Sequence, residues 1–231
     1  MRHYRPAGER GHADHGWLDS RHSFSFAEYY DPRYMGFSAL RVINEDWIAG
    51  GAGFPTHPHR EMEILTYVLE GAVAHRDSMG NVTEVPAGEF QIMSAGTGIT
   101  HSEFNPRDDQ TLHLYQIWIQ PNVKGLTPRY AQCAFPPQVG PQLILSPDED
   151  PVALRIYQDM RLWRWQLSPA EGTQQWSLDP ARHLWLQVVR GQLTLDGQTL
   201  QAGDGLAIWE EASLSLLATQ PDSEVLLFDL P

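Results

Sequence analysis

Short runs of leucine, β-branched and aromatic residues recur along this chain, and Gly, Pro, Asn and Asp separate them at close intervals. Long amphipathic helical patterns are scarce. Many short strands with turn residues between them are typical of a β-sandwich or a β-barrel. We therefore expect an all-β fold, with strands at 37–43, 64–69, 89–93, 112–119, 143–145, 154–157, 163–167, 184–189, 193–195, 206–209, 214–217 and 225–230.

A segment rich in proline and glycine lies near the middle of the chain. Residues 121–141 contain five prolines and two glycines, a density that is unsuited to a central strand. The 231 residues also exceed a typical domain of about 150 residues. We therefore predict two domains, 1–130 and 131–231, joined near this segment.

The two predicted domains contain similar short sequences. YVLEGAV at 67–73 resembles QVVRGQL at 187–193, and VPAGE at 85–89 resembles LQAGD at 200–204. In both, a strand ends in glycine, a second strand follows, and a turn of a small residue, glycine and an acid comes next. The simplest interpretation is two degenerate copies of one β-barrel.

Charge and cysteine content exclude several classes of function. With 16 Lys and Arg against 29 Asp and Glu the formal net charge is −13, and without a basic run nucleic-acid binding is disfavoured. The single cysteine, Cys133, excludes an internal disulfide and a cysteine-based metal cluster. No apolar stretch approaches the roughly 18 residues of a membrane span. We expect a cytoplasmic protein, monomeric, with no nucleic-acid or membrane partner.

Two short motifs could bind a metal ion. His57 and His59 are two residues apart, as are His101 and Glu103, and such residues point to the same face of a strand. On neighbouring strands, the pairs could place three imidazoles and one carboxylate at a single inward point. This donor set suits divalent Fe, Mn, Ni, Cu or Zn. Two unrelated surface pairs are the alternative.

The surrounding residues favour the metal site. Glycines and prolines at the spacings of strand-joining turns surround both motifs between 51 and 104. This region resembles the pirin family of the cupin superfamily, and most closely its short bacterial members that act as quercetin 2,3-dioxygenases. The resemblance is carried by His57-Pro58-His59-Arg60, Glu63, the sequence YVLEG at 67–71, and the run from Gln91-Ile92-Met93 through AGTG at 95–98 to His101-Ser102-Glu103.

The resemblance implies a bicupin with a metal only in the first barrel. Its ligands would be His57, His59, His101 and Glu103, and the ion a divalent transition metal, with iron first and Mn, Ni, Cu, Co and Zn open. In the general cupin pattern, Gln91 stands where the last metal histidine is expected. In the pirin pattern His101 takes that role, and Glu103 is the carboxylate ligand.

Two other carboxylates and the second domain complete the expected site. Glu61 and Glu63 share the spacing of the first histidine pair and are rival ligands, with Glu63 expected to support the ligands from behind. His183 is the only histidine between 142 and 231, and nothing near it has ligand spacing. The C-terminal barrel is therefore expected to hold no metal.

The remaining histidines and the cysteine lie outside the predicted ligand set. His22 precedes the alternating sequence SFSF and could line the mouth of the barrel. His75 lies beside Arg76 and Asp77 and is expected in a solvated turn. The other expectations are exposure for His12 and His15, either face of a strand for His113, and no nucleophilic role for Cys133.

Charge balance limits the substrate. Three neutral imidazoles and one carboxylate leave a divalent metal with a net charge of +1, which a mono-anionic enolate would neutralise. The resemblance makes this a flavonol such as quercetin, whose central ring opens with O2 and loss of carbon monoxide, with Glu103 accepting the hydroxyl proton. Two alternatives remain: a regulatory metal-binding protein without turnover, and a cupin enzyme for another enolisable substrate.

Overall fold

Strands make up most of the chain in the computed structural model, which describes residues 1–231. The two helical segments, Ala7–Glu9 and Pro169–Glu171, are single 3-10 turns, so neither could cross a membrane. Internal contacts divide the chain into two units. The N-terminal unit comprises Gly11–Pro136 and Leu154–Gln158, and the C-terminal unit comprises Met1–Arg10, Pro137–Ala153 and Asp159–Pro231.

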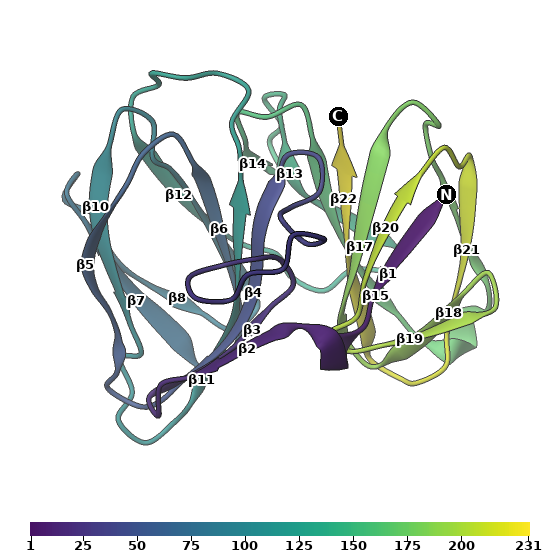
Figure 1. Cartoon of the computed structure of the whole chain (residues 1–231), viewed down its shortest axis with the longest axis horizontal. Coiled ribbons are helices and arrows are strands. Elements are labelled where there is room, and N and C mark those ends of the chain that lie inside the picture. The colour runs from purple at the N-terminus through teal and green to yellow at the C-terminus, as the bar shows by residue number, and fades with distance from the viewer. The chain divides into compact units, whose positions relative to one another are not determined.

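The N-terminal unit is built from two antiparallel sheets (Figure 1). The larger has the strand order β12-β9-β6-β11-β4-β3-β2, and the smaller the order β5-β10-β7-β8. The strands are β2 (Gly11–Asp14), β3 (Leu18–His22), β4 (Leu40–Ile48), β5 (Gly53–His59), β6 (Glu63–Glu70), β7 (Ala72–Asp77), β8 (Val82–Pro86), β9 (Glu89–Ser94), β10 (Ile99–Phe104), β11 (Leu112–Ile119) and β12 (Arg129–Ala134).

The smaller sheet of this unit alternates sharply between an inner and an outer face. In β10, Ile99, His101 and Glu103 are buried, and the residues between them are partly or fully exposed. This is the period of two expected for a strand with one covered face. It places His101 and Glu103 on the inside of the barrel.

The C-terminal unit repeats the two-sheet plan. The strands of its larger sheet that belong to this unit follow the order β1-β20-β17-β22-β15-β13, and its smaller sheet runs β16-β21-β18-β19. Leucines from both sheets fill its core, among them Leu186 and Leu227 of the larger sheet and Leu195 and Leu214 of the smaller. The strands are β1 (Arg2–Arg5), β13 (Pro141–Ser146), β15 (Arg161–Leu167), β16 (Gln174–Ser177), β17 (His183–Arg190), β18 (Gln192–Leu195), β19 (Gln198–Gln201), β20 (Gly205–Trp209), β21 (Ser213–Ala218) and β22 (Ser223–Leu230); the two-residue β14 (Leu154–Arg155) lies in the N-terminal unit.

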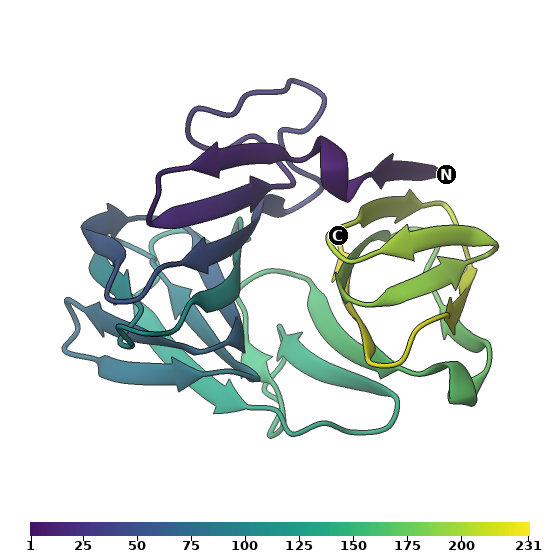
Figure 2. The same cartoon turned by 90° about the horizontal axis from the view of Figure 1, so that it is seen from below.

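The all-β architecture with two cupin-like barrels confirms the predicted fold class. The positions of two strands, β1 and β12, differ from the predicted division of the chain at residue 130. β1 pairs with β20, so the first ten residues belong to the C-terminal unit (Figure 2). β12 forms inside the proline-rich segment and continues to Ala134, pairing with β9 at the edge of the N-terminal unit's larger sheet. An edge strand has one unpaired side, so the prolines around it are tolerated.

Candidate metal centre

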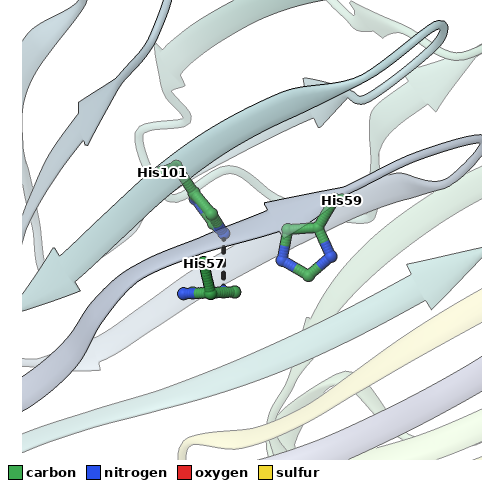
Figure 3. A group of neighbouring side chains, drawn as sticks. All are labelled: His57, His59 and His101. Atoms are coloured by element: carbon green, nitrogen blue, oxygen red, sulfur yellow. Dashed lines mark hydrogen bonds between the residues drawn. The ribbon is translucent and has the colours of Figure 1, made fainter.

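Two paired strands of the N-terminal unit bring three histidines together. β5 supplies His57 and His59, and β10 supplies His101, which lies directly opposite His57 in the antiparallel register. Figure 3 shows the three imidazole rings close together beside these two strands. Three of the four predicted ligands are thus brought together by one strand pair.

The three rings are close enough together to bind one metal ion. His57 Nε2 and His101 Nε2 are 3.1 Å apart, drawn as the dashed line in Figure 3. Ring centroids are separated by 4.8 Å for His57 and His59, 4.5 Å for His57 and His101, and 4.8 Å for His59 and His101. One ligand atom from each lies within 4.8 Å of the others.

The protonation of these rings suits a cation. His57 Nδ1 lies 2.8 Å from the carbonyl oxygen of Pro55, which can only accept, so Nδ1 carries the proton and Nε2 keeps its lone pair. Burial, helped by His57, lowers the pKa of His59 to about 4. Burial and the neighbouring imidazoles lower the pKa of His101 to about 3. Neutral imidazoles with converging nitrogens are the donor set of a divalent transition metal, and the residues present fit that ion.

Glu103 is buried, as His101 is, and accepts hydrogen bonds from three neighbouring side chains. Its Oε1 accepts hydrogen bonds from Gln91 Nε2 at 2.8 Å and Thr66 Oγ1 at 3.3 Å, and its Oε2 accepts one from Gln116 Nε2 at 2.7 Å. Burial raises the pKa of Glu103 to about 7; the charge of Asp46 adds to this, and the three hydrogen bonds oppose it. The β5–β10 register shifts between His101 and Glu103.

The structure places Glu103 in a second group of ligand-type atoms. His75, His101 and Glu103 each offer one atom within 4.8 Å of the others, and all three residues are buried. His101 is shared by this group and the three-histidine group. The four predicted ligands therefore lie in two adjoining groups linked through His101.

The rival carboxylates point to other partners. Glu63 accepts from Ser94 Oγ at 3.0 Å and from the Tyr157 backbone N–H at 3.4 Å. Glu61 accepts from the Gly125 backbone N–H at 3.1 and 3.2 Å. Neither carboxylate belongs to a group of ligand-type atoms.

Two aromatic side chains, those of Trp118 and Phe26, continue the row of ring contacts that begins at the histidines. Trp118 meets His59 edge to face at 4.9 Å, and Phe26 meets Trp118 in the same way at 5.4 Å. His22 is 5.4 Å from Phe26, is buried, and is hydrogen-bonded through Nε2 to Ser20 Oγ at 2.8 Å. His22 therefore lies in the buried interior, joined to the three histidines by two aromatic rings.

The expectation that His75 lies in a solvated turn is wrong. The side chains of His75 and Asp77 are fully buried on β7, with Nε2 and Oδ2 3.1 Å apart, and the imidazole stacks on Tyr130 at 4.6 Å. The signal that could have revealed this is the alternation of Val73, His75 and Asp77, all buried, with more exposed neighbours. The charged residues Arg76 and Asp77 made an exposed turn the expectation for this segment.

Other histidines and the cysteine lie away from the centre. His113 is hydrogen-bonded to Glu45 at 3.0 Å and stacks on Trp47 at 4.4 Å. His183, in the C-terminal unit, donates from Nδ1 to the Pro231 carbonyl oxygen at 2.8 Å. Cys133 is a free thiol on β12.

Two family models match the chain, each over one of its parts. The model described as Pirin matches residues 3–119, and the model described as Quercetinase C-terminal cupin domain matches residues 143–230. Together they span both barrels.

Curated relatives and solved structures match over nearly the whole length. A quercetin 2,3-dioxygenase of Escherichia coli K12 is 60% identical over 100% of this chain and 99% of its own. A pirin-like protein of Caulobacter vibrioides is 41% identical over 97% of each. The crystal structure of E. coli YhhW in complex with nickel(II) is 58% identical, with a TM-score of 0.95, over 100% of this chain and 99% of that one.

Proposed function

Because the chain belongs to the pirin family, we propose that it is a metal-dependent dioxygenase that opens the central ring of a flavonol such as quercetin with O2 and releases carbon monoxide. The observation that carries the proposal is the convergence of three imidazoles, those of His57, His59 and His101, inside the N-terminal unit. It is supported by a relative named quercetin 2,3-dioxygenase at 60% identity and by a related structure with nickel.

The proposed ligands are His57, His59, His101 and Glu103. Three neutral imidazoles and one carboxylate leave a divalent ion with a net charge of +1, so one enolate anion neutralises the site. The bound metal supplies Lewis acidity that favours the ionised form of a hydroxyl beside a carbonyl, and open positions for substrate and O2. Iron is the first expectation, and nickel gains support from the related complex.

Glu103 is proposed to accept the proton of the flavonol 3-hydroxyl. Its oxygens are held by the amides of Gln91 and Gln116 and the hydroxyl of Thr66, so the carboxylate enters the reaction already oriented. A base fixed in position requires little reorganisation when the proton moves. One flavonol and one O2 then give a ring-opened product that retains both atoms of the O2. The ring carbon that carried the hydroxyl leaves with its own oxygen as carbon monoxide, and Glu103 returns the proton to the product.

The side chains of Trp118 and Phe26 provide a surface for a flat substrate. Trp118 packs against His59, and Phe26 packs against Trp118. Aromatic side chains pack against planar rings either in offset stacks or edge to face. We assign these two side chains to orienting the flavonol beside the proposed metal.

The deciding experiment is aerobic turnover of quercetin by protein loaded in turn with Fe(II), Mn(II), Ni(II), Cu(II) and Co(II). We expect loss of the flavonol absorbance together with carbon monoxide release, and neither in His57→Ala. If every loaded form binds its metal but none consumes quercetin, the dioxygenase proposal fails. The regulatory protein and an enzyme for another enolisable substrate then become the leading hypotheses.

A further inference from the structure

A buried histidine–aspartate pair lies next to the proposed ligands without belonging to them. On β7, His75 is opposite Glu103 of β10, and Asp77 is opposite His101. Both side chains are completely inaccessible to solvent. A buried ionisable pair is costly unless it is well hydrogen-bonded, so this placement calls for a specific explanation.

The hydrogen bonds of Asp77 fix the tautomer of His75. Asp77 accepts hydrogen bonds from Asn81 Nδ2 at 2.8 Å and from the backbone N–H groups of Met79 and Asn81 at 2.9 and 3.1 Å. A carboxylate that receives these donors on both oxygens is an acceptor, so His75 donates to it from Nε2 at 3.1 Å. His75 Nδ1 therefore carries a lone pair, and this buried nitrogen has no hydrogen-bond partner.

His101 has a matching nitrogen. His57 holds its proton on Nδ1, so in the 3.1 Å contact His57 Nε2 accepts and His101 Nε2 donates. His101 Nδ1 then also carries a lone pair, and it too is buried without a partner. Two lone pairs cannot hydrogen-bond to each other, which explains why neighbouring rings with centroids 5.4 Å apart leave both nitrogens unpaired.

A cation at His101 Nε2 would change this arrangement. The proton on Nε2 must leave, and the neutral ring then carries its proton on Nδ1, where it becomes a donor. A metal-bound histidine almost always donates its other N–H to an acceptor that fixes the ring. His57 already has one in the Pro55 carbonyl oxygen, whereas His101 has none except His75.

We propose that His75 is a positioning residue of the metal centre. It accepts a hydrogen bond from His101 Nδ1–H, directly or through one water, and Asp77 fixes the tautomer that makes this possible. One ligand-type atom each of His75 and His101 lies within 4.8 Å of the other, so a small ring rotation or a single bridging water completes the chain. The inference rests on the metal centre of the proposed function and adds residues that orient it.

The first test is metal affinity in the full-length protein. His75→Phe keeps an aromatic ring against Tyr130 but removes the acceptor, so we expect Zn(II) and Co(II) to bind about 10- to 100-fold more weakly in chelator competition. His75→Asn retains an acceptor near the position of Nδ1 and is expected to recover most of that loss. His113→Phe is the matched control, because His113 also pairs with a carboxylate and stacks on an aromatic ring, away from both ligand groups. It should leave the affinity unchanged.

The second test reads the tautomers in the unmodified protein, so it does not depend on a variant that folds. Long-range ¹H–¹⁵N spectra should show His101 protonated on Nε2 without metal and on Nδ1 with Zn(II), while His75 stays protonated on Nε2. Protonation of His75 on Nδ1 in the loaded protein, direct coordination of Zn(II) by His75, or unchanged affinity in folded His75→Phe would overturn the proposal.

The same measurements separate this inference from the proposed function. If the wild-type protein binds no divalent metal, both fail. If it binds metal and consumes quercetin, but His75→Phe binds as tightly, only the positioning role of His75 fails. If it binds metal with the expected tautomers and consumes no quercetin, only the dioxygenase activity fails.

Discussion

Glu103 is held entirely by neutral donors, two amides and a hydroxyl. Replacing it with alanine leaves His57, His59 and His101 to bind the metal, but removes the base. We expect Glu103→Ala to weaken metal binding about 10- to 100-fold and, at saturating metal, to lower quercetin turnover by about 10²- to 10⁴-fold. Metal content and turnover measured on the same samples check this. Full activity in the variant would remove Glu103 from the mechanism, and His57→Ala should lose metal and turnover together.

Asp46 gives the N-terminal unit a distinct pH dependence. Burial raises the pKa of Asp46 to about 7, its hydrogen bond from Ser20 opposes the shift, and the charges of Glu45 and Asp19 add to it. In the unfolded chain the group ionises near its ordinary pKa of 3.8, so between about pH 4 and 7 the folded state holds a proton that the unfolded state has lost. Its contribution to stability therefore falls as the pH rises through this window, by about 1.4 kcal/mol per pH unit.

The comparison with Asp46→Asn removes this contribution together with the effect of the Asp46 charge on Glu103, whose pKa that charge raises. Urea unfolding between pH 4.5 and 8 should show the variant gaining stability relative to the wild type as the pH rises, with the difference levelling off above about pH 7. A difference independent of pH would contradict the assignment of a raised pKa to Asp46.

At the scale of elements, the pairing of β5 with β10 depends on a glycine. A Cβ on Gly53 would lie 2.3 Å from the Glu103 carbonyl oxygen and 2.5 Å from Phe104 Cα, both backbone atoms that cannot move aside cheaply. Gly53→Ala should therefore push the two ligand-bearing strands apart. We expect a loss of about 1–3 kcal/mol in the free energy of unfolding together with weaker metal binding.

Denaturant unfolding and metal titration of Gly53→Ala check this prediction. Gly8→Ala serves as the control, because a Cβ there meets nothing within 4 Å and Gly8 has no positive φ. Wild-type metal affinity in a destabilised Gly53→Ala would show that the close approach supports the fold but not the site.

The sequence predicts the hydrophobic strands well and the ligand-bearing sheet poorly. Runs such as 64–69 and 112–119 are visible because most of their residues are apolar. β5 (GFPTHPH) and β7 (AVAHRD) carry proline, histidine and charge, so propensity alone does not mark them as strands. Their polar residues are buried because they meet partners on other strands, as His75 meets Asp77 and Tyr130. Such long-range pairing cannot be deduced from local composition.

At the scale of the whole molecule, the two units share one strand plan. Gly71 and Gly191 directly follow β6 and β17 with φ of +77° and +71°, and Gly88 and Gly203 precede β9 and β20 with φ of +88° and +87°. Equivalent backbone hydrogen bonds join these turns: Gly88 N–H to the Val68 carbonyl and Gly203 N–H to the Val188 carbonyl, both at 2.9 Å. The sequence similarity between 67–89 and 187–204 thus corresponds to repeated turn geometry.

The same register shows how the second barrel differs. In the N-terminal unit His101 pairs with His57, and Glu103 pairs with His75. At the matching pairs of the C-terminal unit, Leu214 pairs with Trp176 and Leu216 pairs with Leu195. Apolar side chains replace both pairs of ligand-type residues, and they belong to, or pack against, the leucine-rich core.

Because the C-terminal barrel has apolar residues in place of the ligand-type pairs, we predict one metal ion per chain of 26.1 kDa, bound by the N-terminal unit alone. A ligand that binds only the folded state suppresses local opening of the strands that hold it. With Zn(II), amide hydrogen exchange should therefore slow in β5, β7 and β10 and stay unchanged in β16, β18 and β21. His101→Ala treated in the same way should show no slowing in either unit. A stoichiometry of two, or metal-dependent protection in β16 or β21, would show that the apolar replacements have not abolished metal binding in the C-terminal barrel.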